Sequence, residues 1–150
     1  MGLTFSRTHA APGRTRCASD GFGDRLIPMS KSTLFDPTQA GVLDLAEATQ
    51  FSDTGVVSRA LHDEDGVRMT LFAFAAGQRV TEHSTPARAL VQILSGTCEF
   101  TLAGKTTPLR AGNLLHMPPG FPHAVFATEA FSMLLITVRE KGTTAEPRPS

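Results

Sequence analysis

From residue 56 to residue 138, apolar side chains recur mostly at every second position. Cys98, Phe100 and Leu102, for example, alternate with polar residues, as in a strand with one buried face. The pattern predicts strands at 56–61, 67–74, 89–94, 98–102, 113–117, 123–127 and 131–138, and a short one that ends near Leu109. Short strands at such regular spacing, with Gly and Pro in the turns, predict an all-β sandwich or barrel.

Two segments are predicted to form structures other than these strands. Residues 62–66 have the sequence His-Asp-Glu-Asp-Gly and separate two predicted strands, so they predict a hairpin turn. Residues 42–49 contain the one candidate for a helical turn, although 42–45 also fit an extra edge strand.

The ends of the chain differ from its centre. Residues 1–28 contain four arginines, several Gly and Ser residues and no apolar periodicity. An Arg- and Ser-rich, acid-poor segment partly fits a transit peptide, but Pro12 and Gly13 would interrupt the amphipathic helix that such a peptide needs. We expect a disordered extension instead, either native or created by a start codon upstream of Met29. The expected organisation is this extension, an N-terminal arm or edge strand at 29–55, a barrel at 56–138 and a disordered tail at 139–150.

Composition narrows the classes of function. The 150 residues suffice for one domain, and the 14 basic residues equal the 14 acidic ones in number. With no net charge and no basic run among aromatics, we expect neither a nucleic-acid nor a membrane-surface partner. No run of about 20 apolar residues is present to span a bilayer. Cys17 and Cys98 cannot form a disulfide framework, so a reduced, cytoplasmic protein is expected.

Two segments carry histidines at a distinctive spacing. The first reads Gly77-Gln-Arg-Val-Thr-Glu-His83-Ser-Thr85-Pro-Ala-Arg-Ala89, with Gly96 seven residues on, and the second reads Gly112-Asn-Leu-Leu-His116-Met-Pro118-Pro-Gly120-Phe-Pro-His123. The spacing resembles the two signature motifs of the cupin superfamily, in particular its small single-domain conserved-barrel proteins. The resemblance covers about 56–138 and implies a double-stranded β-helix, a jelly-roll-like barrel whose open end holds the site.

The same resemblance assigns the metal-ligand positions to His83, Thr85, Ala89 and His123. Ala89 has no donor atom, and a neutral Thr85 hydroxyl is a poor ligand for the metals that imidazole binds. Two histidines therefore remain, whereas catalytic metal sites generally have three protein ligands. The implied cofactor is a weakly held divalent metal ion of unknown identity.

Three other side chains are candidates to complete such a site. Glu82 neighbours His83 on a strand and is expected to face outward. Gln92 is also expected on the outer face, unless a one-residue bulge reverses it. His116 would add a third nitrogen if it points inward, and the sequence leaves its direction open.

Strand parity predicts a mostly apolar pocket inside the barrel. Its expected lining consists of Thr85, Ala89, Val91, Ile93, Phe126 and Met133, together with the histidines. Arg79 and Arg88 are the nearest cations, and each is either solvated or positioned to hold a carboxylate at the rim. No Gly-x-Ser-x-Gly nucleophile motif is present, and Cys98 lies within a strand pattern, which argues against a Cys-His nucleophile.

These features favour a protein that binds a small organic molecule in the barrel, with a degenerate divalent-metal site at His83 and His123. A metal-dependent oxygenase or isomerase acting on a small organic acid is the alternative enzyme class. A non-catalytic sensor module is the third hypothesis. By resemblance we also expect a homodimer, to which residues 42–45 could contribute an edge strand.

Overall fold

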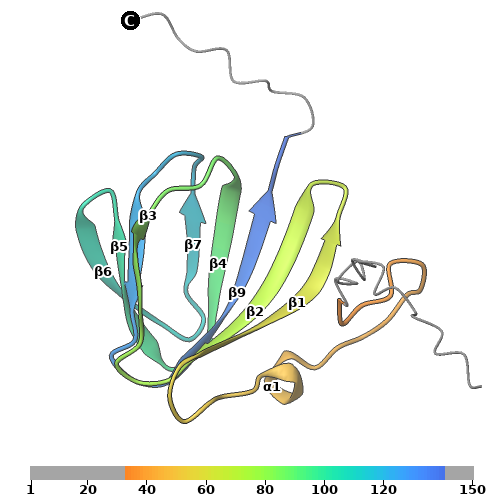
Figure 1. Cartoon of the computed structure of the whole chain (residues 1–150), viewed down its shortest axis with the longest axis horizontal. Coiled ribbons are helices and arrows are strands. Elements are labelled where there is room, and N and C mark those ends of the chain that lie inside the picture. Colours follow the sequence, from red (N-terminus) through yellow and green to blue (C-terminus); the bar gives the residue numbers. More distant parts are fainter. Residues whose placement is uncertain (1–32, 141–150) are drawn as a thin grey trace, which may run out of the picture. The chain divides into compact units, whose positions relative to one another are not determined.

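A computed structural model describes residues 33–140 of the chain, which Figure 1 shows in colour. The predictions for residues 1–28, for a start at Met29 and for most of the C-terminal tail lie outside the described residues. No helix in the described part is long and apolar enough to cross a membrane.

The described chain is built almost wholly from strands. Its elements are α1 (Leu45–Ala48), β1 (Val56–Glu64), β2 (Val67–Phe74), β3 (Arg79–His83), β4 (Arg88–Ser95), β5 (Thr97–Leu102), β6 (Lys105–Arg110), β7 (Leu114–Met117), β8 (His123–Phe126) and β9 (Phe131–Val138). Eight of the nine strands match segments predicted from alternation. β3 was not among the segments predicted from alternation, although a strand was assumed around Glu82 and His83, because four of its five residues are exposed and no apolar alternation marks it.

The strands form two antiparallel sheets. The order β1-β2-β9-β4-β7 makes up a five-stranded sheet, and β3-β8-β5-β6 makes up a four-stranded one. Figure 1 shows the two sheets curving around a common interior, with their ends open at the top of the view. The predicted all-β double-stranded β-helix is therefore confirmed.

The first hairpin turn is shorter than predicted. β1 continues through Glu64, so only Asp65 and Gly66 form the turn, with φ angles of 52° and 80°. Two consecutive positive φ angles are typical of the tight two-residue turn that matches the twist of antiparallel strands. The prediction that residues 62–66 all belong to the turn was wrong, because polar residues on an edge strand resemble a loop in sequence.

The main core lies between the two sheets. It includes Phe74, Val91 and Phe131 from the five-stranded sheet and Phe100 and Val125 from the four-stranded sheet. The rings of Phe74 and Phe131 are fully buried and stack with their centroids 4.6 Å apart. This stack joins the paired strands β2 and β9 within the core.

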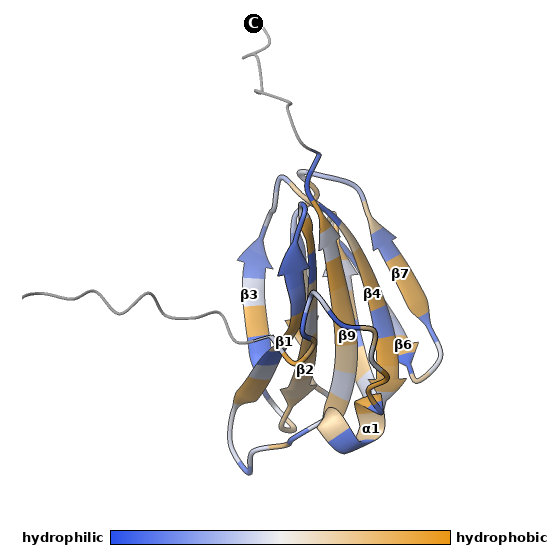
Figure 2. Cartoon of the chain, turned by 90° about the vertical axis from the view of Figure 1, so that its right-hand side faces the viewer, coloured by the Kyte–Doolittle hydropathy of each residue, from blue (hydrophilic) through white to orange (hydrophobic). Residues whose placement is uncertain are grey.

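A second, smaller core covers the outer face of the five-stranded sheet. The N-terminal arm packs Phe35, Leu43 and Leu45 against Leu61 and other outward side chains of that sheet. Figure 2 shows the arm and α1 in front of this sheet. Within 42–49 the helical turn is confirmed, and the edge strand proposed at 42–45 is absent.

The hydrogen bonds at the start of α1 explain why this segment forms a helical turn and not a strand. The carboxylate of Asp44 accepts hydrogen bonds from the backbone N–H groups of Ala46 and Glu47, which caps the helix. Arg59 on β1 donates a hydrogen bond to the carbonyl of Ala48 at the other end. The arm is thus fixed to the sheet by polar contacts as well as by apolar packing.

Candidate functional site

His83 and His123 lie side by side on neighbouring strands. They are register partners of β3 and β8, and their ring centroids are 4.2 Å apart with the ring planes tilted by 55°. His123 is 7% exposed, whereas His83 is exposed to solvent. The pair therefore spans the boundary between the barrel interior and the solvent.

Each of these imidazoles is oriented by its own backbone. Nδ1 of His83 lies 2.9 Å from the carbonyl oxygen of Thr81, and Nδ1 of His123 lies 3.0 Å from that of Phe121. A carbonyl oxygen only accepts, so in both rings Nδ1 carries the hydrogen and donates it. The Nε2 atom of each neutral ring then keeps a lone pair, the arrangement found in histidines that bind metals or accept a proton.

The segments that carry the two histidines are also joined directly. The backbone N–H of Gly120 donates a 2.8 Å hydrogen bond to the carbonyl of Thr85. Gly120 has a φ of 82°, which glycine adopts without strain, and it follows two prolines that restrict the turn. The signature glycine therefore positions this turn relative to the first segment.

Both rings line a small apolar cavity between the sheets, with a volume of about 170 Å³. We call it the apolar cavity, and its lining consists of Phe72, Phe74, Val80, His83, Val91, Phe100, Met117, His123, Val125, Met133 and Leu135. The ring of Phe100 is nearly parallel to that of His123, at a centroid distance of 6.2 Å. Apart from the two imidazoles, every lining residue is apolar, the usual profile of a pocket that binds a small organic molecule.

The predicted pocket residues separate into four groups. Val91 and Met133 line the apolar cavity, and Ala89 and Ile93 are buried in the surrounding core. Thr85 lines a different cavity, described below. Phe126 was expected inside and lies on the outer face, because His123 and Val125 point inward and strand alternation turns the next residue outward.

Among the described residues, the structure brings no third ligand to the histidine pair. His116 is exposed and adjacent to the buried cavity residue Met117, so it faces the opposite side of β7. Glu82 and Gln92 are exposed, as expected from their parity. Within residues 33–140 no three His, Cys, Asp or Glu side chains come together as a metal site. The donor set fits two imidazole ligands and falls short of the three protein ligands of a catalytic centre.

A second cavity adjoins the first and contains two arginines. We call it the arginine cavity; its volume is about 320 Å³ and its lining consists of Ser58, Arg68, Thr70, Phe72, Thr85, Ala87, Leu135, Thr137 and Arg139. Sequence reasoning missed Arg68 and Arg139 and considered Arg79 and Arg88 instead. Arg79 lies on the outer surface, 5.6 Å from the centre of the Phe126 ring, and Arg88 is exposed beside inward-facing Ala89. The signal for Arg68 was present in the sequence, since it shares the parity of Phe72 and Phe74 on β2.

Cys98 takes no part in either cavity. It is 1% exposed, and burial raises the pKa of its thiol to about 11. A thiol with so high a pKa stays protonated at neutral pH and is a poor nucleophile. This agrees with the expectation that no Cys-His nucleophile operates here.

Comparison with known proteins links the fold to a family. Residues 70–139 match the Cupin domain family. A conserved protein of unknown function from Streptococcus pyogenes is 36% identical, with a TM-score of 0.66 over 74% of this chain and 97% of that one. No curated protein matches the chain.

Two further structures are described as cupins. A cupin superfamily protein from Desulfitobacterium hafniense is 31% identical, with a TM-score of 0.63 over 68% of this chain and 94% of that one. A cupin 2 conserved barrel domain protein from Leptotrichia buccalis is 34% identical, with a TM-score of 0.62 over 65% of this chain and 47% of that one. With its two facing sheets and paired histidines, the chain belongs to the cupin superfamily.

Proposed function

We propose that this protein binds a small organic molecule in the apolar cavity, with His83 and His123 as the polar groups that orient it. The observation that carries the proposal is the lining itself, which combines nine apolar side chains with two imidazoles whose Nδ1 atoms are already bonded to backbone carbonyls. Apolar walls favour the body of an organic ligand, and the two Nε2 atoms can accept hydrogen bonds from it.

A divalent metal ion is a second ligand that these imidazoles fit, and we include weak metal binding in the proposal. The fixed Nδ1–H tautomer leaves Nε2 as the donor atom, as metal binding by histidine requires. With two protein nitrogens, the ion would depend on water or on the organic ligand for its other coordination positions.

We place the protein in the cytoplasm, as its free buried Cys98 is compatible with a reducing compartment.

Methionine methyl groups provide a direct test of ligand binding. Met117 and Met133 line the apolar cavity, whereas Met69 packs on the outer face of the five-stranded sheet. In protein labelled with ¹³C at the methionine methyls, a small apolar probe such as 1-hexanol should shift the signals of Met117 and Met133 and leave that of Met69 unchanged. Equal shifts at all three, or none at any, would show that the cavity does not take up the probe.

Metal binding is tested with matched histidine variants. After chelation, titration with Zn²⁺ should give weak binding that His83→Ala or His123→Ala abolishes. His116→Ala is the control, since this histidine is exposed on the far side of β7. Loss of binding in the control would refute the two-histidine site. Tight, stoichiometric metal in protein purified without added metal would instead favour a metal-dependent enzyme.

A further inference from the structure

The inward face of the five-stranded sheet changes from apolar to cationic along its length. On β2 the inward residues run from Phe74 and Phe72 through Thr70 to Arg68. β9 runs antiparallel to β2 and carries the matching series Phe131, Met133, Leu135, Thr137 and, just beyond the strand, Arg139. Antiparallel pairing therefore brings the two arginines to the same end of the sheet.

The backbone holds both arginines in place. Arg68 is the register partner of Thr137, and the backbone N–H of Arg139 donates a 2.8 Å hydrogen bond to the carbonyl of Gly66. Both side chains line the arginine cavity, and among the residues that the structure describes they are its only charged ones. Hydroxyl groups of Ser58, Thr70 and Thr85 complete its polar lining.

The arginine cavity and the apolar cavity share two wall residues. Phe72 and Leu135 line both, so the cationic space lies next to the apolar one along the same sheet. A ligand that extends past the side chains of Phe72 and Leu135 would contact both spaces, with a charged end at the arginines and an apolar body in the apolar cavity. An apolar cavity of about 170 Å³ suits a short alkyl chain and is too small for a drug-sized body.

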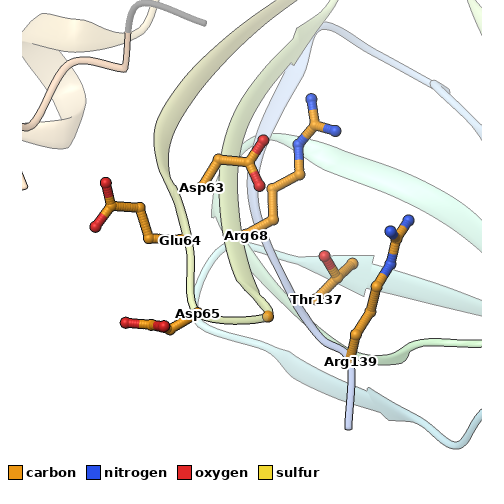
Figure 3. Close-up of a pocket in the computed structure, with 7 residues that line it drawn as sticks. Asp63, Glu64, Asp65, Arg68, Thr137 and Arg139 are labelled. Carbon is orange, nitrogen blue, oxygen red and sulfur yellow. The ribbon is translucent and has the colours of Figure 1, made fainter. Parts of the chain in front are cut away.

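Three carboxylates lie near the arginines and must be considered. Asp63, Glu64 and Asp65 line a neighbouring pocket of about 270 Å³, together with Arg68 and Arg139. Figure 3 shows the Asp63 carboxylate on the side of Arg68, its register partner, while Glu64 and Asp65 extend away from both guanidinium groups. The two guanidinium groups therefore outnumber the one carboxylate of this pocket that lies on their side.

We propose that Arg68 and Arg139 bind the carboxylate of a small monocarboxylic acid whose apolar body occupies the apolar cavity. This inference rests on the proposed function and specifies the ligand class. Guanidinium groups pair with carboxylates through two parallel N–H···O bonds, which are stronger than neutral hydrogen bonds. Both arginines are exposed at the open end, so the anion reaches them without a change in the fold.

The test compares hexanoate with 1-hexanol, which share an apolar chain but differ in charge. Their dissociation constants are measured from the methyl shifts of Met117 and Met133 in the full-length chain. We expect hexanoate to bind at least tenfold more tightly than 1-hexanol. Combining Arg68→Gln with Arg139→Gln should remove this preference. Arg88→Gln, at an exposed position beside inward-facing Ala89, is the matched control and should retain it.

The outcomes separate this inference from the proposed function. If both probes bind wild-type protein equally, or if the double variant keeps the preference for hexanoate, the arginine site is refuted and the apolar cavity remains a binding site. If neither probe shifts Met117 or Met133, both proposals fail. Thermal unfolding of each variant shows whether a loss of binding reflects a loss of fold.

Discussion

Gly96 offers the sharpest test of how a signature residue stabilises this fold. It connects β4 to β5 with a φ of 70°, and a Cβ at this position would collide with the carbonyl oxygen of Ala130 and lie 2.8 Å from Cα of Phe131. Left-handed backbone costs a non-glycine residue about 1–2 kcal/mol. Overpacking against neighbours that cannot move adds about 1–3 kcal/mol. We therefore expect Gly96→Ala to lower the free energy of unfolding by about 2–5 kcal/mol.

Gly104 is the matched control. It lies in the β5–β6 turn with a φ of 79°, and no heavy atom lies within 4 Å of the position that its Cβ would take. Gly104→Ala should therefore incur only the backbone cost of about 1–2 kcal/mol. Urea denaturation of both variants gives the difference, provided that their m-values agree. Losses equal to within about 0.5 kcal/mol would refute the assigned collision at Gly96, because such a difference is smaller than the expected overpacking cost.

Three further predictions concern the core, the thiol and the assembly. Phe74→Ala should lower the free energy of unfolding by about 3–5 kcal/mol, since the ring is fully buried and stacked on Phe131; a loss below about 2 kcal/mol in chemical denaturation would contradict this. Burial raises the pKa of Cys98 to about 11, so between about pH 9 and 11 the thiol ionises in the unfolded chain before it does so in the folded one. Over this range the free energy of unfolding should fall in wild-type protein and fall less in Cys98→Ala. Equal pH dependence in the two melting series would argue against this. The homodimer expected from the family should appear as twice the chain mass in light scattering at micromolar concentration, and a monomer would overturn it.

The strands were predictable wherever buried apolar side chains mark at least one face. β2 and β9 match their predicted limits because apolar side chains alternate between a core on each face and turns bound them. Alternation did not predict β3, because four of its five residues are exposed and its pairing with β8 is a long-range contact. Local patterns cannot reveal a strand whose stability comes from a distant partner.

The site was predictable to the extent that spacing and parity determine it. The motif spacing located His83 and His123, and the pairing of β3 with β8 makes them neighbours. The direction of His116 depended on the register of β7, which the sequence does not contain. The arginine cavity could not be predicted, because it depends on how β2 pairs with β9. Arg68 and Arg139 are far apart in the sequence and line one cavity only in the folded chain.

The bulge in β1 has a consequence for the charge of the open end. Register shifts between Ala60 and His62, so Leu61 joins the outer core and Asp63 is placed opposite Arg68. The arm stabilises this bulge, because the N–H groups of Leu34 and Phe35 donate hydrogen bonds to the carbonyls of Ala60 and Leu61. If the register of the Ala60–Thr70 pair continued without this shift, His62 would lie opposite Arg68 and the carboxylate would leave this face. Deleting Leu61 would remove the bulge but keep Asp63 opposite Arg68, because the two-residue turn at Asp65 and Gly66 fixes that pair, so the charge facing the arginines is insulated from changes of length further along this edge strand.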